Sequence, residues 1–349
     1  MKVLMKGNEA VCEAAIRAGC KAFFGYPITP QNEVPEYMSQ KMEASGGVFI
    51  QAESEVAAIN MIYGAAAAGA RVMTSSSSPG IALKQEGISF LAAANLPCLI
   101  VSVSRSGPGL AGILPSQSDY FQATKGGGNG DYYLPVFAPN SVQEATDFIQ
   151  KGFVVAEKYR TPTMVLLDGL LGQMMEPVEF TPPNLPETDK SWTVGPHKGR
   201  ARNIVNSLDL SAESLELTNI ARFKRYDEIA ANETMFESSV KDGDEVALVA
   251  YGTPARIAVN AIENLRESGI RAGLIRPITL WPFPDAAFQN LPQSVKRVVV
   301  LELSQGQMVH DVRLAINGKL PVHFYGRNGG IIFEAQEIAT QVTRFVRGE

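Results

Sequence analysis

The sequence predicts an α/β fold with largely parallel sheets, arranged in two units along the chain. In the first half, apolar runs of strand length such as "LPCLIVSVSRS" and "PTMVLLDG" alternate with helical patterns. The same alternation returns in residues 243–349, after a stretch that is rich in proline and polar side chains. Strands that alternate with helices of this length form parallel sheets covered by helices.

Each element expected in the first unit, residues 1–180, rests on its side-chain pattern. Apolar and β-branched runs predict strands, and Ala-rich or periodic stretches predict the helices between them. In chain order we expect a strand at 21–24 before Gly25, a strand at 48–51, a helix at 53–69, a strand at 70–73 that leads into a serine loop at 75–80, a helix to Ala94, the strand "LPCLIVSVSRS", a helix at 141–158 and the strand "PTMVLLDG".

Residues 181–242 read as an extended linker that lies over the surface and contains one or two helices. The stretch "EFTPPNLPETDK" has many prolines and few large apolar side chains, and a charged stretch follows. A disordered tail between the units is the alternative. Apolar side chains able to pack argue against it: Trp192, Leu215, Ile220, Phe223 and Tyr226.

The second unit, residues 243–349, is predicted to be a small doubly wound α/β domain. "EVALVAYGT" is a buried strand, and "PARIAVNAIENLRESG" is an amphipathic helix with Pro254 near its start and Gly269 at its end. The remaining expected elements are the strands "RAGLIRPITL", "KRVVVLEL" and "PVHFYG", a helix after Gln305 and a last helix to Arg347.

Composition excludes several classes of function. The chain has 349 residues and a net charge of −5, which argues against a general electrostatic surface for nucleic acid. No apolar run is long enough to span a membrane, and the start "MKVLMKGNEA" is too short and polar for a signal peptide. We therefore expect a cytoplasmic protein without a nucleic-acid or membrane partner.

Cysteine and histidine usage predicts no metal site in this chain. Cys12, Cys20 and Cys98 form no CxxC pair, so neither a zinc site nor an iron–sulfur cluster is expected. The histidines are far apart in sequence and are expected to be ordinary surface or core side chains: His197, His310 and His323.

Four strand-end loops of the first unit carry the candidate functional side chains. Ligands bind open parallel sheets at the carboxyl ends of the strands. The four loops are "YPITP" at 26–30, "QAESE" at 51–55, the serine run at 75–80 and "SRSGPG" at 104–109. Together they would offer a hydroxyl, carboxylates, serines and a guanidinium at one rim, although each loop taken singly could be purely structural.

Glu55 is the candidate catalytic carboxylate. It opens the expected Ala-rich helix, where a carboxylate is also favoured by the helix dipole alone. Its apolar neighbours would leave it partly desolvated and able to share a proton with a heterocycle. Glu53 is the rival and is expected to face another direction. Arg105, at the end of an apolar strand, is either a solvated side chain or a bidentate fork for a carboxylate.

Two glycine-rich stretches carry competing interpretations. "GPGLAG" at 107–112 matches a dinucleotide-binding pattern, but Pro115 falls where the helix should continue, so the match is weak. The loop from Lys125 to Asp131 could cradle an anion or could be a flexible loop at an interface; it lacks the second half of a P-loop.

Taken together, these blocks resemble the alpha subunit of the 2-oxoacid:ferredoxin oxidoreductases over nearly the whole chain. The resemblance rests on "GYPITP", "ESEVAAINMIYGAAAAGA", "TSSSSPGIAL", "SRSGPG", "PSQSDYFQATKGGGNGDY" and "PTMVLLDG", followed by "YGTPARIAVNAIENLRESG", "RPITLWPFP" and "LELSQGQMVHDVR". The version with "SRSGPG" and "PSQSDYFQA" is most similar to the branched-chain, 2-oxoisovalerate type.

The resemblance implies a pyrimidine-binding domain of a thiamine diphosphate enzyme, followed by a transketolase C-terminal-like domain. It assigns Glu55 to the cofactor's aminopyrimidine, Thr29 and Arg105 to the 2-oxoacid, and Tyr26, Pro27 and Ile28 to the lining of the cofactor. It also implies oxidative decarboxylation of the acid with coenzyme A, giving acyl-coenzyme A, carbon dioxide and reduced ferredoxin.

The resemblance further implies a divided enzyme. The diphosphate-binding pattern, GDG with a later asparagine pair, is absent. Thiamine diphosphate would therefore be shared with a beta subunit, and Mg²⁺ and [4Fe-4S] clusters would lie on partner chains, including gamma and ferredoxin-like delta subunits. The alternatives are a pyruvate or 2-oxoglutarate enzyme, a thiamine-dependent half-enzyme without ferredoxin, and a noncatalytic scaffold subunit.

Overall fold

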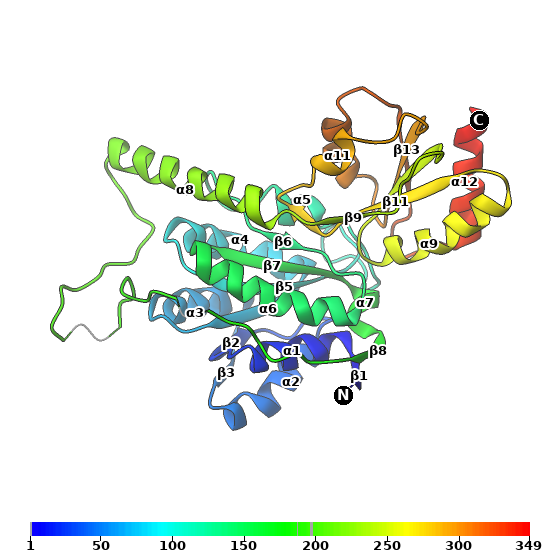
Figure 1. The fold of residues 1–349 in the computed structure, drawn as a ribbon. Helices are drawn as coiled ribbons and strands as arrows, with labels where there is room; N and C mark the ends of the chain where they lie inside the picture. The colour runs from blue at the N-terminus through cyan, green and yellow to red at the C-terminus, as the bar shows by residue number, and fades with distance from the viewer. Residues whose placement is uncertain (1, 187, 196–197) are drawn as a thin grey trace.

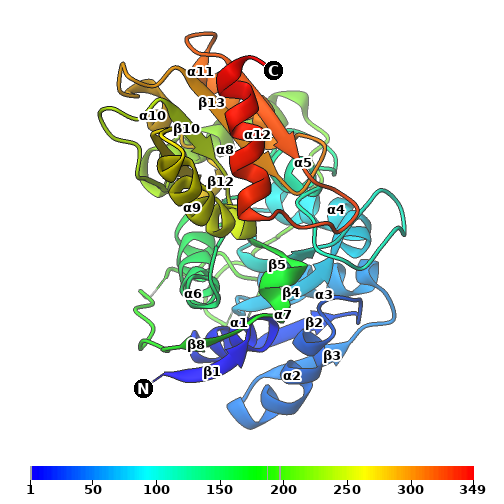
Figure 2. The same ribbon diagram turned by 90° about the vertical axis from the view of Figure 1, so that its right-hand side faces the viewer.

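The chain folds into two α/β units, stacked one above the other in Figures 1 and 2. The structure is a computed structural model, and it describes residues 2–186, 188–195 and 198–349. His197 lies outside these residues. His310 contacts the ring of Phe121, and His323 stacks on Phe345.

The first unit is built on one large sheet in the order β12-β6-β7-β5-β4-β2-β3. All neighbouring strands run parallel except β12 and β6. The strands are β2 (Ala22–Gly25), β3 (Val48–Gln51), β4 (Val72–Ser77), β5 (Cys98–Ser104), β6 (Val136–Phe137), β7 (Pro162–Asp168) and β12 (Thr279–Trp281). Strands β4, β5 and β7 are buried along their whole length, as expected for a parallel sheet covered on both faces.

Helices cover both faces of this sheet. In Figure 2, α1 (Gly7–Arg17) and α6 (Val142–Tyr159) lie on one side, and α3 (Glu55–Ala67) and α4 (Ser78–Ala93) lie on the other. The shorter helices of this unit are α2 (Glu33–Lys41), the 3₁₀ turn Glu43–Ser45, α5 (Tyr120–Thr124) and α7 (Gly169–Gln173). A separate antiparallel pair joins β1 (Val3–Lys6) to β8 (Met175–Val178).

The second unit has its own sheet, in the order β14-β13-β10-β11-β9. Its strands are β9 (Phe236–Ser238), β10 (Val246–Val249), β11 (Ala272–Pro277), β13 (Arg297–Glu302) and β14 (Val322–Gly326). Helices α9 (Gly252–Glu267) and α12 (Ala335–Arg347) pack together on one face, and α11 (Met308–Ile316), with α10 (Ala286–Gln289) beside it, covers the other. The expected amphipathic helix ending before Gly269 is confirmed as α9.

The stretch between the units contains the long helix α8 (Ala212–Glu233), which confirms the helix expected there. Tyr226 and Ile229 are its buried apolar side chains, and Tyr226 meets Tyr133 and Trp281 edge to face. Figure 1 shows the preceding segment extending away from the body before it returns into α8. The boundaries at 180 and 242 remain predictions, although β9 from within 181–242 pairs with β11.

Three expectations about local structure were wrong or incomplete. The run "RAGLIRPITL" does not form one strand: β11 ends at Pro277, which has no N–H to donate, and β12 crosses to the first sheet. The serine run is not a loop, because β4 continues to Ser77 in register with β5 and α4 begins at Ser78. The short strands β1, β6 and β8 had no expected counterpart in the sequence.

Buried polar contacts tie the two units together. The Gln117 side chain donates to the Tyr251 carbonyl and accepts from the Leu303 N–H, at 2.9 and 3.0 Å. Asp311 accepts from the Tyr120 hydroxyl at 2.5 Å and pairs with Lys125 at 2.6 Å. These contacts fix the second unit against the loops that follow β5.

Candidate functional site

The carboxyl ends of β2, β3, β4 and β5 meet at one edge of the first sheet, as the sequence predicts. Strand β2 pairs with both β3 and β4, and β4 pairs with β5, all in parallel. Side chains and backbone from successive ends then touch: Arg105 reaches the Thr29 carbonyl, and Ser78 contacts the Arg105 backbone. The candidate residues from distant parts of the sequence therefore share one rim.

Glu55 is buried at the start of α3. Ser54 caps the helix by accepting a hydrogen bond from the Ala57 N–H at 3.1 Å, which aligns the first turn. The Glu55 side chain is 7% exposed, whereas Glu53 is exposed on the preceding loop. Within the described residues, no hydrogen bond or ion pair reaches the Glu55 carboxylate. A buried carboxylate that accepts no hydrogen bond is unfavourable unless a ligand donates one.

Gly80, in the first turn of α4, makes room for this carboxylate. A Cβ at residue 80 would lie 2.7 Å from Glu55 Oε1 and 2.1 Å from Ser76 Oγ. The helix α4 can approach α3 and β4 this closely only because residue 80 has no side chain. The hydroxyls of Ser76, Ser77 and Ser102 are also buried without a hydrogen-bond partner in the described chain.

The loop that carries Tyr26, Pro27, Ile28 and Thr29 is held by its backbone, so that its side chains face outward. Tyr26 is 36% exposed, Pro27 is exposed, and Ile28 and Thr29 are half-buried. Thr29 Oγ1 accepts a long hydrogen bond of 3.4 Å from Asn32. The structure thus presents all four predicted side chains at the rim.

Three side chains outside residues 26–30 anchor the backbone of this loop, two of them from the distant helices α1 and α7. Asn8 donates to the Pro30 carbonyl at 2.8 Å, and Gln173 donates to the same oxygen at 3.0 Å. Gln31 is fully buried; it accepts from the Ser75 hydroxyl at 2.5 Å and donates to the Tyr26 carbonyl at 3.4 Å. These anchors are not predictable from the sequence, because no local pattern indicates which amide meets which carbonyl.

Arg105 is not a solvated strand-end side chain. It is 5% exposed, and its Nη1 and Nη2 donate to the carbonyls of Thr29 and Leu110 at 2.9 and 3.0 Å. Its Nε has no partner. Part of the expected carboxylate-binding fork is therefore occupied by backbone, and the guanidinium reaches the loop of Thr29 directly.

Asp119 is a buried carboxyl of the site that no pattern in the sequence indicated. The Ser78 hydroxyl accepts from the Arg105 N–H at 2.9 Å and donates to Asp119 Oδ2 at 2.5 Å. Burial raises the pKa of Asp119, and the hydrogen bond from Ser78 and the charge of Arg105 act in the opposite direction. Asp119 follows no strand end, so its place near Arg105 could not be read from strand order.

Two hollows adjoin this rim. One, of about 780 Å³, lies between the units and is lined by Ser78, Asp119 and Gln122 from the first and by Ser304 and Gln307 from the second. The other, of about 450 Å³, is bounded by Thr29, Ile113, Leu114 and Gly169, among others. Both are large enough for part of a small organic ligand.

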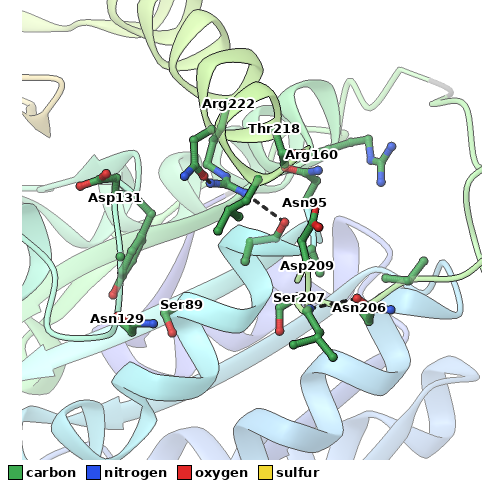
Figure 3. A pocket seen from close by; sticks show the side chains of 18 of the residues that line it. Ser89, Asn95, Asn129, Asp131, Arg160, Asn206, Ser207, Asp209, Thr218 and Arg222 are labelled. Atoms are coloured by element: carbon green, nitrogen blue, oxygen red, sulfur yellow. Dashed lines mark hydrogen bonds between the residues drawn. The ribbon is translucent and has the colours of Figure 1, made fainter. Parts of the chain in front are cut away.

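A third hollow, of about 550 Å³, lies away from the strand ends and contains none of the predicted site residues. Figure 3 shows Arg222 entering it from α8, Ser89 from α4, and Asn206, Ser207 and Asp209 from the extended segment.

Neither glycine-rich stretch forms a nucleotide site. Residues 107–112 begin no helix, and Pro115 instead forms an isolated bridge with Arg105, so the dinucleotide-binding pattern is a chance match. The Lys125 ammonium is engaged by Asp311 and so is not directed at an anion in the glycine loop. Among the described residues there is no cluster of three metal-ligating side chains and no helix long and apolar enough to cross a membrane. Cys12, Cys20 and Cys98 are buried free thiols.

Comparison with known proteins agrees with this geometry. Residues 13–241 match the family described as pyruvate flavodoxin/ferredoxin oxidoreductase, thiamine diphosphate-binding, and residues 244–338 match pyruvate:ferredoxin oxidoreductase core domain II. The ketoisovalerate oxidoreductase subunit VorB of Methanothermobacter thermautotrophicus is 46% identical over 99% of this chain and 98% of its own length.

Solved structures show the same relationship. The 2-oxoglutarate:ferredoxin oxidoreductase of Magnetococcus marinus, solved with 2-oxoglutarate, coenzyme A and succinyl-CoA bound, superimposes with a TM-score of 0.89 at 29% identity. The match covers 98% of this chain and 65% of that one. A split-gene transketolase, at 14% identity and a TM-score of 0.59, shares the fold. The chain therefore belongs to the 2-oxoacid:ferredoxin oxidoreductase family, as its alpha-type, thiamine diphosphate-binding subunit within a multi-subunit enzyme.

Proposed function

We propose that this subunit supplies the pyrimidine half of a thiamine diphosphate site that decarboxylates a branched-chain 2-oxoacid. With coenzyme A and ferredoxin, the assembled enzyme would yield acyl-coenzyme A, carbon dioxide and reduced ferredoxin. The observation that carries the proposal is the buried Glu55 carboxylate, which accepts no hydrogen bond within the described residues and for which Gly80 makes room at the shared strand edge.

Glu55 is suited to hold a proton on the aminopyrimidine ring. A carboxylate that is enclosed and not already paired can accept a hydrogen bond from a ring nitrogen and share its proton. The unsatisfied hydroxyls of Ser76 and Ser77 nearby are further donors that a polar ring could engage. Thiamine diphosphate, when bound, supplies the thiazolium that acts as the electron sink for decarboxylation.

The rim side chains would position the acid. In this proposal Tyr26, Pro27 and Ile28 line the cofactor, and Thr29 lies beside the reacting centre. The positive charge of the Arg105 guanidinium attracts the substrate carboxylate, and its Nη1 holds the Thr29 backbone. Correct orientation of the reactants can lower an activation barrier by roughly 7–11 kcal/mol, and positioning of this kind can supply several kcal/mol of that.

The remaining parts of the active enzyme would come from partner chains. The relative at 46% identity is itself named as a subunit. Beside Arg105, the loop side chains Leu110, Ile113 and Leu114 are 81%, 57% and 54% exposed. An exposed apolar group of this kind is typical of a surface covered on assembly.

We assign the diphosphate and Mg²⁺ to the beta subunit, and the [4Fe-4S] clusters to partner chains among the beta, gamma and ferredoxin-like delta subunits. Three free thiols fit a reducing, cytoplasmic location.

The choice of a branched-chain acid rests on the ketoisovalerate relative. 2-Oxoglutarate is the second candidate substrate, because the structural neighbour solved with this acid bound has an overall fold so similar to that of this chain.

Exchange of Glu55 tests the catalytic assignment. Glu55→Gln in the assembled complex should lower 2-oxoacid-dependent dye reduction about 100-fold or more, because the amide cannot take up the proton. Glu53→Gln is the matched control and should leave the rate within about twofold, since Glu53 is exposed. Full activity of Glu55→Gln would remove its catalytic role.

Gly80→Ala tests the close approach of α4. The new methyl group would displace Ser76 Oγ and the Glu55 carboxylate, and should destabilise the chain by about 1–3 kcal/mol while weakening cofactor binding. Gly64→Ala in α3, where a Cβ meets nothing within 4 Å, should instead stabilise the chain by about 0.5–1 kcal/mol. Urea unfolding and cofactor titration measure both effects, and equal behaviour of the two variants would contradict the steric account.

Arg105→Lys tests the binding of the substrate carboxylate. Lysine has no planar fork, so KM for the 2-oxoacid should rise roughly 10- to 100-fold, more than kcat falls. Steady-state dye reduction at varied acid concentration gives both constants. An unchanged KM would show that the acid is held elsewhere.

Substrate choice is tested by comparing 2-oxoisovalerate, pyruvate and 2-oxoglutarate as reductants of a viologen dye. With the purified complex, kcat/KM for 2-oxoisovalerate should exceed the other two by roughly tenfold or more. Pyruvate lacks the two methyl groups that a branched-chain pocket would bury, and 2-oxoglutarate carries a second carboxylate that such a pocket would leave unpaired. A preference for 2-oxoglutarate would overturn the branched-chain assignment without affecting the family.

A further inference from the structure

Lys84 is a fully buried lysine in α4 to which the proposed chemistry gives no task. Its side chain is 0% exposed, and its Nζ donates to Thr74 Oγ1 at 2.6 Å and to the Ser75 carbonyl at 3.0 Å. Lysine is almost never fully buried unless its charge is compensated. Its presence behind the strand ends therefore requires a physical reason.

The helix geometry places Lys84 on the side of α4 that meets α3. Lys84 follows Gly80 by four residues, one helical turn, and a Cβ at Gly80 would contact Glu55. One turn further on, Gly87 lies against Ile59, itself one turn after Glu55. The ammonium thus lies between α3, α4 and β4, next to the start of the helix that carries Glu55.

Two acidic groups act on the Lys84 charge, Glu55 from α3 and Cys98 from β5. Burial lowers the pKa of Lys84 to about 7, and both groups act in the opposite direction. Burial raises the pKa of Cys98 to about 12, so this thiol is neutral at pH 7. Among the described residues, the Glu55 carboxylate is therefore left as the counter-charge of Lys84.

Lys84 also anchors the backbone beneath the rim. Thr74, which accepts from its ammonium, donates onward to the Phe24 carbonyl at 2.6 Å, two residues before Tyr26. Ser75, whose carbonyl accepts from Lys84, donates through its hydroxyl to Gln31, and Gln31 binds the Tyr26 carbonyl. Two short chains of hydrogen bonds thus connect one buried charge to both ends of the loop that presents Thr29.

We propose that Lys84 is a positioning residue of the cofactor site: its buried ammonium is the counter-charge of Glu55 and anchors the strand ends that present Tyr26 to Thr29. The two charges are then coupled, because without the Glu55 carboxylate Lys84 holds its proton less tightly. The role toward the cofactor rests on the proposed function, whereas the coupling belongs to this chain alone.

Stability of the full chain against pH tests the coupling without cofactor or partner. Unfolded lysine has a pKa of about 10.4. Between pH 7 and about 10 the unfolded chain therefore holds one more proton at Lys84 than the folded chain, and this group makes folding more favourable as pH rises. Below pH 7 both states are protonated, and the unfavourable burial of the charge is felt in full.

Lys84→Met removes the charge and keeps the side-chain length. The folding equilibrium constant of the variant should exceed that of the unaltered chain, and by the largest factor at pH 6. The ratio of the two constants should then shrink by up to tenfold per pH unit between pH 7 and 10. Lys319→Met, at an exposed lysine, is the control and should give a ratio that is flat over this range. A flat ratio for Lys84→Met as well would overturn the proposal.

Glu55→Gln tests the partner with Lys84 left in place, which also covers the case in which Lys84→Met does not fold. Without the carboxylate charge, Lys84 should lose its proton at lower pH. The free energy of unfolding should therefore begin to rise with pH about one pH unit lower than in the unaltered chain. If Glu55→Gln leaves this onset unchanged, the two groups are not coupled and the proposal fails. Inactivity of every complex would count against the proposed function alone.

In the assembled complex, Lys84→Met separates positioning from general packing. Because Glu55 loses its counter-charge and the strand ends lose their anchor, kcat should fall about tenfold, with KM for the 2-oxoacid nearly unchanged. A rise of KM as large as the fall of kcat would show a packing role only and would contradict the proposal.

Discussion

The close contact of α4 with α3 at Gly80 is the constraint on which the candidate site depends. Because residue 80 has no Cβ, the first turn of α4 lies against Ser76 and the Glu55 carboxylate. A second missing side chain, at Gly87, lets α4 lie against Ile59. These two contacts hold α3 close to α4, and this packing encloses Glu55 at the start of α3. Glu53 precedes the helix and remains exposed to solvent. The catalytic candidate is thus selected by helix packing rather than by its own chemistry.

Enclosure of this kind makes the polar groups around the site depend on one another. Five polar side chains around the site are at most 7% exposed: Gln31, Ser75, Lys84, Arg105 and Asp119. Each relies on a particular partner to offset the loss of water. Lys84 weakens the folded state below pH 7 by itself, so its position is understandable only together with Glu55 and the strand ends that it holds. A site assembled from such groups is rigid, because moving one leaves another unsatisfied.

Much of this fold could be predicted from local pattern, and the failures have a common cause. Buried strands such as β5 and amphipathic helices such as α9 were predicted, because their side-chain periodicity is local. Strand β12 was misassigned because its partner β6 belongs to the other unit. The serine run was read as a loop because serine is common in turns, yet its backbone pairs residue by residue with β5. In the site, strand order brought Glu55, Thr29 and Arg105 to one rim, but Asp119 and Gln31 depend on contacts between distant segments that no local pattern encodes.

At the rim, hydrogen bonds hold the backbone of the loop at residues 26–30, while several of its side chains remain accessible. This order suits a site that two subunits share. The carbonyls of Tyr26, Thr29 and Pro30 are each bound by a buried or partly buried side chain. The loop therefore cannot rearrange without breaking several hydrogen bonds, whereas Tyr26 and Pro27 remain open to contact. Groups that are ordered before a ligand arrives lose little conformational entropy when it binds. A subunit that contributes only one half of a site gains most from such order, because both the cofactor and the partner chain must meet a surface that is already in place.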